Sequence, residues 1–166
     1  QTRPPAGTGQ FYPGTPTELS AFLDEHLRPE HEGGGVRDLI VPHAGYQFSG
    51  AVAARAFSRV APGEFSRALV LAPSHRAPLR GISVAPYDAY QTPLGAIEVD
   101  RDACDRLLQL PQATSDRAAH EHEHALEVQL PFIQRLAESA RLIPVLVGPE
   151  LDEATLAALG AGLAEA

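Results

Sequence analysis

Two histidines each follow a short apolar run, and this arrangement predicts a shared metal site. His43 follows the predicted strand 38–41 and a proline, and His75 follows the predicted strand 68–71, a proline and a serine. The Ala-rich segment 49–61 between them reads as a helix, which predicts a β–α–β unit with two neighbouring parallel strands. Ligands bind at the carboxyl ends of the strands in open α/β sheets. The two imidazoles are therefore expected to converge, as the ligands of a transition metal do.

The residues beside the two histidines favour a site over a purely structural role. Taken singly, each histidine could be a polar residue at a strand end that binds a backbone carbonyl. Ala44-Gly45, however, permits a tight turn and a close approach of backbone to a ligand. Tyr46 brings a phenol close to His43, and Ser74 stands next to His75. Two matched positions one crossover apart therefore predict a common pocket.

A second group of titratable residues is the run His120-Glu121-His122-Glu123-His124, followed by Glu127. It contains the letters His-Glu-x-x-His of zinc proteases, but no histidine follows His124 to act as a third ligand. We expect the first three residues of the run to form an exposed, charged helix start. His124 and Glu127 border an apolar run, so we expect them to point inwards.

Composition limits the function classes. The 166 residues carry a net charge of −8 and no basic cluster, which argues against nucleic-acid binding. No apolar run approaches the roughly 20 residues that span a bilayer. The only cysteine, Cys104, has no partner for an internal disulfide, which suits a reducing cytoplasm, and we expect it to pack in the core.

Local patterns predict the remaining elements of one α/β domain over 1–166. Residues 1–16 read as an extended arm that anchors through its aromatic pair at 11–12. The other predictions are a helix over 17–27 capped by Thr15 or Thr17, a strand over 81–85, a loop over 86–95, a helix over 100–110, a helix over 120–138 kinked at Pro131, a strand over 142–147 and a helix over 151–166.

Several longer segments resemble, in order and over essentially the whole chain, the signature segments of the Memo family, whose bacterial and archaeal members are called AmmeMemoRadiSam system protein B. These segments are AGTGQFYP (6–13), VPHAGYQFSG (41–50), LAPSHR (71–76), YQTPLG (90–95), EHALEVQLPF (123–132) and IPVLVG (143–148).

The resemblance implies an α/β fold with a mainly parallel sheet flanked by helices, similar to the class III extradiol dioxygenases. It implies that His43 and His75 hold the metal, and it supports His124 and Glu127 as residues that line the site. His124 and Tyr46 are our candidates for catalytic proton transfer. The candidates for positions in the pocket or behind the ligands are Ser74, Tyr90 and Glu127.

Family members continue beyond the segments present here and carry, in that later part, a cysteine as third metal ligand. The third ligand is therefore expected to be absent from this chain. The chain looks like the amino-terminal part of such a protein. Iron(II) is the expected ion, with copper or zinc as alternatives, and oxygenase or redox chemistry is the expected activity. The alternative is a protein- or peptide-binding signalling module that uses the same pocket without catalysis. The ligand is then an unidentified small molecule or peptide, and the oligomeric state is open.

Overall fold

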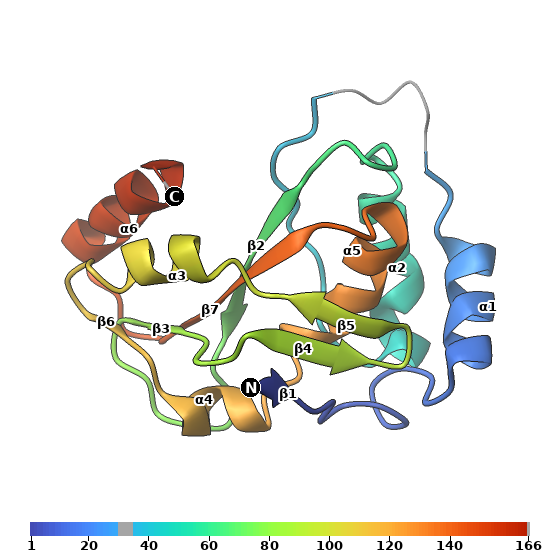
Figure 1. Ribbon diagram of the computed structural model, residues 1–166, viewed down its shortest axis with the longest axis horizontal. Helices are drawn as coiled ribbons and strands as arrows, with labels where there is room; N and C mark the ends of the chain where they lie inside the picture. Colours follow the sequence, from blue (N-terminus) through green and yellow to red (C-terminus); the bar gives the residue numbers. More distant parts are fainter. Residues whose placement is uncertain (30–34, 166) are drawn as a thin grey trace.

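The computed structural model describes residues 1–29 and 35–165 as a mixed α/β fold (Figure 1). Its elements, in chain order, are β1 (Thr2–Arg3), α1 (Pro16–His26), a π-helical turn (Tyr46–Gly50), α2 (Ala51–Phe57), β2 (Arg67–Pro73), β3 (Ile82–Val84), β4 (Ala89–Thr92), β5 (Gly95–Glu98), α3 (Arg101–Leu107), β6 (Ala113–Thr114), α4 (Arg117–Glu121), a 3₁₀ turn (Glu127–Gln129), α5 (Leu130–Leu136), β7 (Arg141–Val147) and α6 (Glu153–Glu165).

The main sheet has the strand order β2-β7-β3-β6. β2 and β7 pair in parallel along their whole length, whereas β3 pairs with β7 in the antiparallel direction. β7 lies between two strands and is buried over most of its length, which explains its continuous apolar sequence. Helices α1, α2 and α5 group beside β2 and β7, and α3 and α6 lie together toward the other end of the sheet (Figure 1).

A small second sheet holds the start of the chain against the body. β4 and β5 form an antiparallel hairpin, and β1 pairs in parallel with β4. The arm that follows β1 is therefore fixed at its first residues. Within the described residues, no helix is both long and apolar enough to cross a lipid bilayer.

Several predicted elements are confirmed. α1 begins after Thr15, whose side-chain oxygen accepts a hydrogen bond from the Glu18 N–H, as expected of an N-cap. The predicted strands 68–71, 81–85 and 142–147 correspond to β2, β3 and β7, and the helices over 100–110 and 151–166 correspond to α3 and α6. Cys104 is fully buried on α3 as a core residue.

The predicted strand 38–41 is wrong, because the structure has no strand there. β2 pairs with β7 on one side, and no strand of the described residues pairs with its other side. Segment 38–41 has the apolar residues of a strand but makes no backbone-to-backbone hydrogen bond with any described residue, and the side chain of Ile40 is fully exposed. The predicted β–α–β unit with two paired strands is thus corrected to one paired strand, β2, and an extended segment.

The single helix predicted over 120–138 is also wrong. The chain ends α4 at Glu121, makes an irregular turn, and resumes with the 3₁₀ turn and α5. Pro131 lies in the first turn of α5. N–H groups in the first turn have no acceptor within the helix, so the lack of an N–H on proline costs nothing there. Pro131 therefore starts a helix and does not kink one. The loop predicted over 86–95 contains β4, which is stabilised by pairing with both β1 and β5.

Candidate metal centre

Three imidazole rings lie together at one edge of the fold. His43 precedes the π-helical turn, His75 follows β2, and His124 lies in the turn after α4. The ring centres of His43 and His75 are 5.2 Å apart, those of His75 and His124 are 5.0 Å apart, and those of His43 and His124 are 6.3 Å apart. Although the strand before His43 does not form, its imidazole and that of His75 lie close together, as the sequence predicts.

The spacing of the first pair matches two ligands of one ion. A metal–nitrogen bond of about 2.0–2.1 Å places each ring centre about 3.2 Å from the ion, so two imidazoles at a tetrahedral angle have centres about 5.2 Å apart. The separation of His43 and His75 has this value. The ring centre of His124 is farther from that of His43, at 6.3 Å, but lies only 5.0 Å from that of His75.

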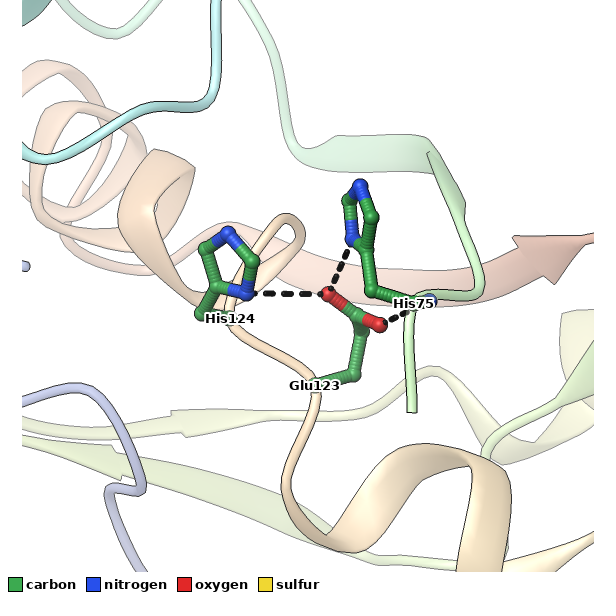
Figure 2. Close-up of side chains that lie close together, drawn as sticks. All are labelled: His75, Glu123 and His124. Atoms are coloured by element: carbon green, nitrogen blue, oxygen red, sulfur yellow. Dashed lines mark hydrogen bonds and ion pairs between the residues drawn. The ribbon is translucent and has the colours of Figure 1, made fainter. Parts of the chain in front are cut away.

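Glu123 fixes the orientation of His75. Its carboxylate is buried and accepts hydrogen bonds from the His75 backbone N–H at 2.6 Å, the His75 Nδ1–H at 3.0 Å and the Ala125 N–H at 2.9 Å (Figure 2). A carboxylate can only accept from Nδ1, so His75 has its proton on Nδ1 and its Nε2 lone pair is free. Burial alone would raise the pKa of Glu123, but these hydrogen bonds outweigh it and lower that pKa, so the carboxylate stays charged.

His124 is held between two rings. It stacks on Phe11, with ring centres 4.0 Å apart, and on His75, with ring centres 5.0 Å apart. Burial lowers the pKa of His124, as do the imidazoles of His75 and His43, although the charge of Glu123 opposes the shift. The ring is therefore neutral at pH 7, the form that accepts a proton or binds a metal.

A possible metal-ligand group at this cluster consists of His75, Glu123 and His124 and does not include His43. One ligand atom each from His75, Glu123 and His124 lie within 4.8 Å of one another, which makes two histidines and a carboxylate. The Nδ1 of His124 is 3.3 Å from Glu123 Oε1 without the alignment of a hydrogen bond, and it is buried with no such partner among the described residues. The second nitrogens of His75 and His124 lie on the same side, away from Glu123 (Figure 2).

The break after α4 makes this arrangement possible. The side chains of adjacent residues on a continuous helix point about 100° apart. On such a helix, Glu123 and His124 could not both face His75. In the irregular turn, Glu123 N–H bonds to the His120 carbonyl, and Val128 N–H bonds to the His124 carbonyl. Both side chains thereby point to the same cluster, and the following 3₁₀ turn starts directly from it.

Comparison with known sequences identifies the family of this chain. The family model described as Memo-like protein matches residues 3–166, which is nearly the whole chain. The chain belongs to the Memo family. A "MEMO1 family protein" of Thermococcus onnurineus is 40% identical over 173 residues, covering 99% of this chain and 59% of the relative. Relatives with that family name in Pyrococcus abyssi and Aquifex aeolicus are 38% and 36% identical and cover 99% and 89% of this chain.

The chain spans a little over half the length of these relatives. The matched part is 59% of the Thermococcus onnurineus and Pyrococcus abyssi proteins and 55% of the Aquifex aeolicus protein. The site described here thus belongs to a Memo-family region that, in these relatives, is joined to a substantial further length of chain.

A second buried carboxylate, Glu127, anchors the amino-terminal arm of this Memo-family chain. Its Oε2 accepts from Arg3 Nη1 at 2.6 Å and from the Ala6 N–H at 2.9 Å, and its Oε1 accepts from the Gly7 N–H at 2.9 Å and the Tyr12 hydroxyl at 2.6 Å. Arg3 and Glu127 are 1% and 0% exposed, so their ion pair is shielded from water. Four donors from the arm therefore converge on one carboxylate.

The anchored arm forms one wall of the candidate metal centre. Phe11 lies between Gly7 and Tyr12, which are both bound to Glu127, and its ring covers His124. The Phe11 carbonyl also accepts the Tyr46 N–H at 2.6 Å, close to His43 in the chain. The hydrogen-bond partners of Glu127 in the described part of the chain all lie on the arm, so it acts on the site through the arm.

The other predicted site residues bind neighbouring protein groups. The Tyr46 hydroxyl donates to the Val128 carbonyl at 2.7 Å, and burial raises the pKa of Tyr46 well above its ordinary value. The Ser74 hydroxyl donates to the Ala77 carbonyl at 2.7 Å and closes the turn that carries His75. The structure therefore places Ser74 beside the cluster, and the catalytic role of Tyr46 stays a prediction.

His120 corrects the expectation of an exposed helix start. Its imidazole is buried: Nε2–H donates to the Ser83 carbonyl at 3.0 Å, so Nδ1 accepts from the Tyr90 hydroxyl at 3.2 Å. Glu121 and His122 are exposed as predicted. The Tyr90 hydroxyl, predicted to line the pocket, thus binds His120, and burial raises the pKa of Tyr90 well above its ordinary value.

Two residues of the site were missed by the sequence analysis. Glu123 falls within the helix predicted over 120–138 and has no predicted role there, although its position directly before His124 is a usable signal. Phe11 was expected to anchor the arm, but no local pattern indicates that its ring lies on His124, because the two residues are more than a hundred positions apart.

Replacing Glu127 by Gln is predicted to destabilise the fold and release the arm. The neutral amide leaves the buried Arg3 charge unpaired, so the free energy of unfolding should fall by about 3–5 kcal/mol in urea titrations. Tyr12→Phe, which removes one of the four donors, should lose roughly 1.5–3 kcal/mol. Glu121→Gln, on an exposed carboxylate, is the control and should stay within about 0.5 kcal/mol. A Glu127→Gln variant as stable as this control would contradict the anchoring role.

The stability of the protein is predicted to fall as the pH drops from 6.5 toward 4. Burial lowers the pKa of His120 to about 4 in the folded state, whereas the unfolded chain binds a proton near 6.5. The unfolded state then holds more protons in this window, so the stability is fully present above 6.5 and declines by up to ~1.4 kcal/mol per pH unit below it. Urea titrations at pH 7, 6 and 5 measure the slope. His120→Gln should flatten the slope of stability against pH, whereas His122→Gln, at an exposed site, should leave it unchanged. Equal slopes in the wild type and in His120→Gln would contradict the assignment of this pH dependence to His120.

Proposed function

We propose that this chain carries a non-haem metal site in which His43 and His75 are ligands and His124 holds or moves a proton beside them. The observation that carries the proposal is the 5.2 Å separation of the His43 and His75 rings, with His75 turned by the buried Glu123 so that Nε2 is free. Neutral imidazoles with a carboxylate behind one of them are the usual first and second shells of protein metal sites.

Iron(II) is the ion we propose, with copper or zinc as alternatives. Imidazole nitrogen suits all three ions, so the ligand type alone does not select one. An iron ion held by few protein ligands has open positions, at which oxygen or a substrate oxygen binds in non-haem oxygenases. Cys104 is buried and has no partner cysteine, which fits the reducing cytoplasm that we propose as the location.

The chain's own residues orient the ligands and supply a base. Glu123 keeps the proton of His75 on Nδ1 and so keeps Nε2 available. His124 is neutral at pH 7 because burial lowers its pKa, and it can accept a proton from a hydroxyl group of a substrate bound near His43. Phe11 covers one face of His124 and excludes water from that side.

A second candidate function is the binding of a peptide at the same pocket without catalysis. Phe48 and Val52, on the turn and helix that follow His43, are 78% and 60% exposed. Such apolar side chains beside a polar pocket are typical of protein–protein contact sites. Metal bound at full occupancy with no consumption of oxygen in the presence of catechols would favour this function over an oxygenase.

Metal analysis of the purified chain tests the proposal. Protein from cells grown with added iron, and separately with added copper, should contain close to one metal ion per chain. His43→Ala and His75→Ala should each remove the metal, because each takes away a ligand. Glu123→Gln should weaken metal binding roughly 10- to 100-fold, since it releases the His75 ring but keeps both ligands.

His122→Ala is the matched control, because His122 is exposed and two residues from His124. It should keep the full metal content. If His75→Ala retains the metal while the folded state is intact by circular dichroism, the two-histidine site is refuted. If His122→Ala loses as much metal as His75→Ala, the bound ion sits elsewhere and the proposal also fails.

A further inference from the structure

The Glu123 carboxylate faces two imidazole nitrogens with a single oxygen. Its Oε1 lies 3.0 Å from His75 Nδ1 and 3.3 Å from His124 Nδ1, and Figure 2 shows both nitrogens turned toward it. His75 Nδ1 is on the opposite side of its ring from Nε2, the nitrogen proposed above to bind an ion together with His43. These three donor atoms therefore form a separate group, which does not use His43.

The Nδ1 of His124 is unsatisfied in this group. It is buried and has no hydrogen-bond partner among the described residues. If it carries the ring proton, that proton is poorly aligned with Glu123 Oε1. If it does not, its lone pair faces a charged oxygen, which is repulsive. A cation between these atoms removes both problems, whereas a purely structural bond between Glu123 and His75 leaves His124 Nδ1 without a partner.

The two nitrogen–oxygen separations match those of neighbouring ligands on one ion. Bonds of about 2.0–2.1 Å place two ligand atoms about 2.9 Å apart at a right angle and about 3.4 Å apart at a tetrahedral angle. The separations of 3.0 Å from His75 and 3.3 Å from His124 both lie within this range. An ion can therefore enter the group with little movement of the three side chains.

Glu123 is held in place by bonds that an ion would leave intact. Its Oε2 accepts the His75 backbone N–H at 2.6 Å, and its Oε1 accepts the Ala125 N–H at 2.9 Å. Each carboxylate oxygen has two lone pairs, so Oε1 can bind an ion while it still accepts from Ala125. The Glu123 side chain is 1% exposed, whereas that of His75 is 40% exposed, which gives an ion a path from solvent.

We propose that His75 Nδ1, Glu123 Oε1 and His124 Nδ1 form a second metal position, which takes a divalent ion such as zinc. The ion replaces the proton on His75 Nδ1. Where His75 Nε2 is free, that nitrogen takes up a proton in exchange and the ring stays neutral. Where Nε2 already holds an ion, the displaced proton goes to solvent and the ring bridges the two ions. Two imidazoles and one carboxylate, with a fourth position open, are a ligand set of catalytic zinc sites.

An ion in the second position opposes the proton transfer proposed for His124. With its Nδ1 bound to the ion, the neutral His124 ring has its proton on Nε2 and no free nitrogen to accept another. The second ion is therefore an inhibitor of the site. This regulatory consequence rests on the proposed function, whereas the metal position itself does not.

Zinc titration of the metal-free His43→Ala variant tests the second position alone, because this variant lacks a ligand of the first. In long-range ¹H–¹⁵N NMR, zinc should shift the Nδ1 resonances of His75 and His124 and place the His75 proton on Nε2. Adding His124→Gln removes a ligand and should weaken zinc binding by at least about 100-fold, the upper end of the effect of losing a residue behind a ligand. Adding His122→Gln, at an exposed histidine, is the matched control and should leave the affinity unchanged.

Three results would overturn the proposal. The first is a His43→Ala variant that binds no zinc even at about 1 mM. The second is zinc that shifts His75 Nε2 and neither Nδ1 resonance. The third is an affinity that His124→Gln leaves unchanged in a variant whose amide spectrum is that of the folded protein.

The wild type separates this proposal from the proposed function. Once one ion is bound at His43 and His75, excess zinc should shift the Nδ1 resonances of His75 and His124 and release one proton per ion. A wild type that holds no ion at His43 and His75 would refute the first site, while the zinc response of His43→Ala would still support the second. A wild type that holds the first ion, together with a His43→Ala variant that ignores zinc, would refute the second position alone.

Discussion

The bonds between the Glu123 carboxylate and His75 are the constraint on which the site depends. Glu123 binds both the backbone N–H and the ring of His75, and it does so from a turn in which the chain has left the helical path. This joins the end of β2 to the segment after α4 and sets which imidazole nitrogen is free. A buried carboxylate that accepts three N–H hydrogen bonds recovers much of what it loses by leaving water, which is why the pKa of Glu123 is lowered despite its burial.

A second carboxylate, four residues later, holds the site from the other direction. Glu127 binds Arg3, two arm N–H groups and Tyr12, and so the first twelve residues become part of the body of the fold. The arm then places Phe11 on His124. The same short segment therefore carries one carboxylate that orients a proposed metal ligand and one that positions the wall of the pocket.

The sequence predicted the meeting of His43 and His75 because each follows an apolar run and a proline at a comparable point. It did not predict that segment 38–41 would stay unpaired, since strand pairing depends on a neighbour that local patterns do not reveal. The apolar spacing of Leu126, Leu130 and Ile133 suggested one continuous helix, whereas the buried bonds of Glu123 break it. Tertiary contacts override helical periodicity at this point. The periodicity gives no indication of Glu123, the residue that orients His75 in the site.

Long-range ¹H–¹⁵N NMR of the histidine side chains tests the central claim most directly, because it reports which ring nitrogen of His75 carries the proton. In the metal-free protein at pH 7, we expect His75 to be protonated at Nδ1 and bare at Nε2, and the Nε2 resonance to shift when zinc is added as a diamagnetic probe. In Glu123→Gln this preference should weaken. A His75 ring protonated at Nε2, or one whose Nε2 resonance ignores the metal, would contradict the account.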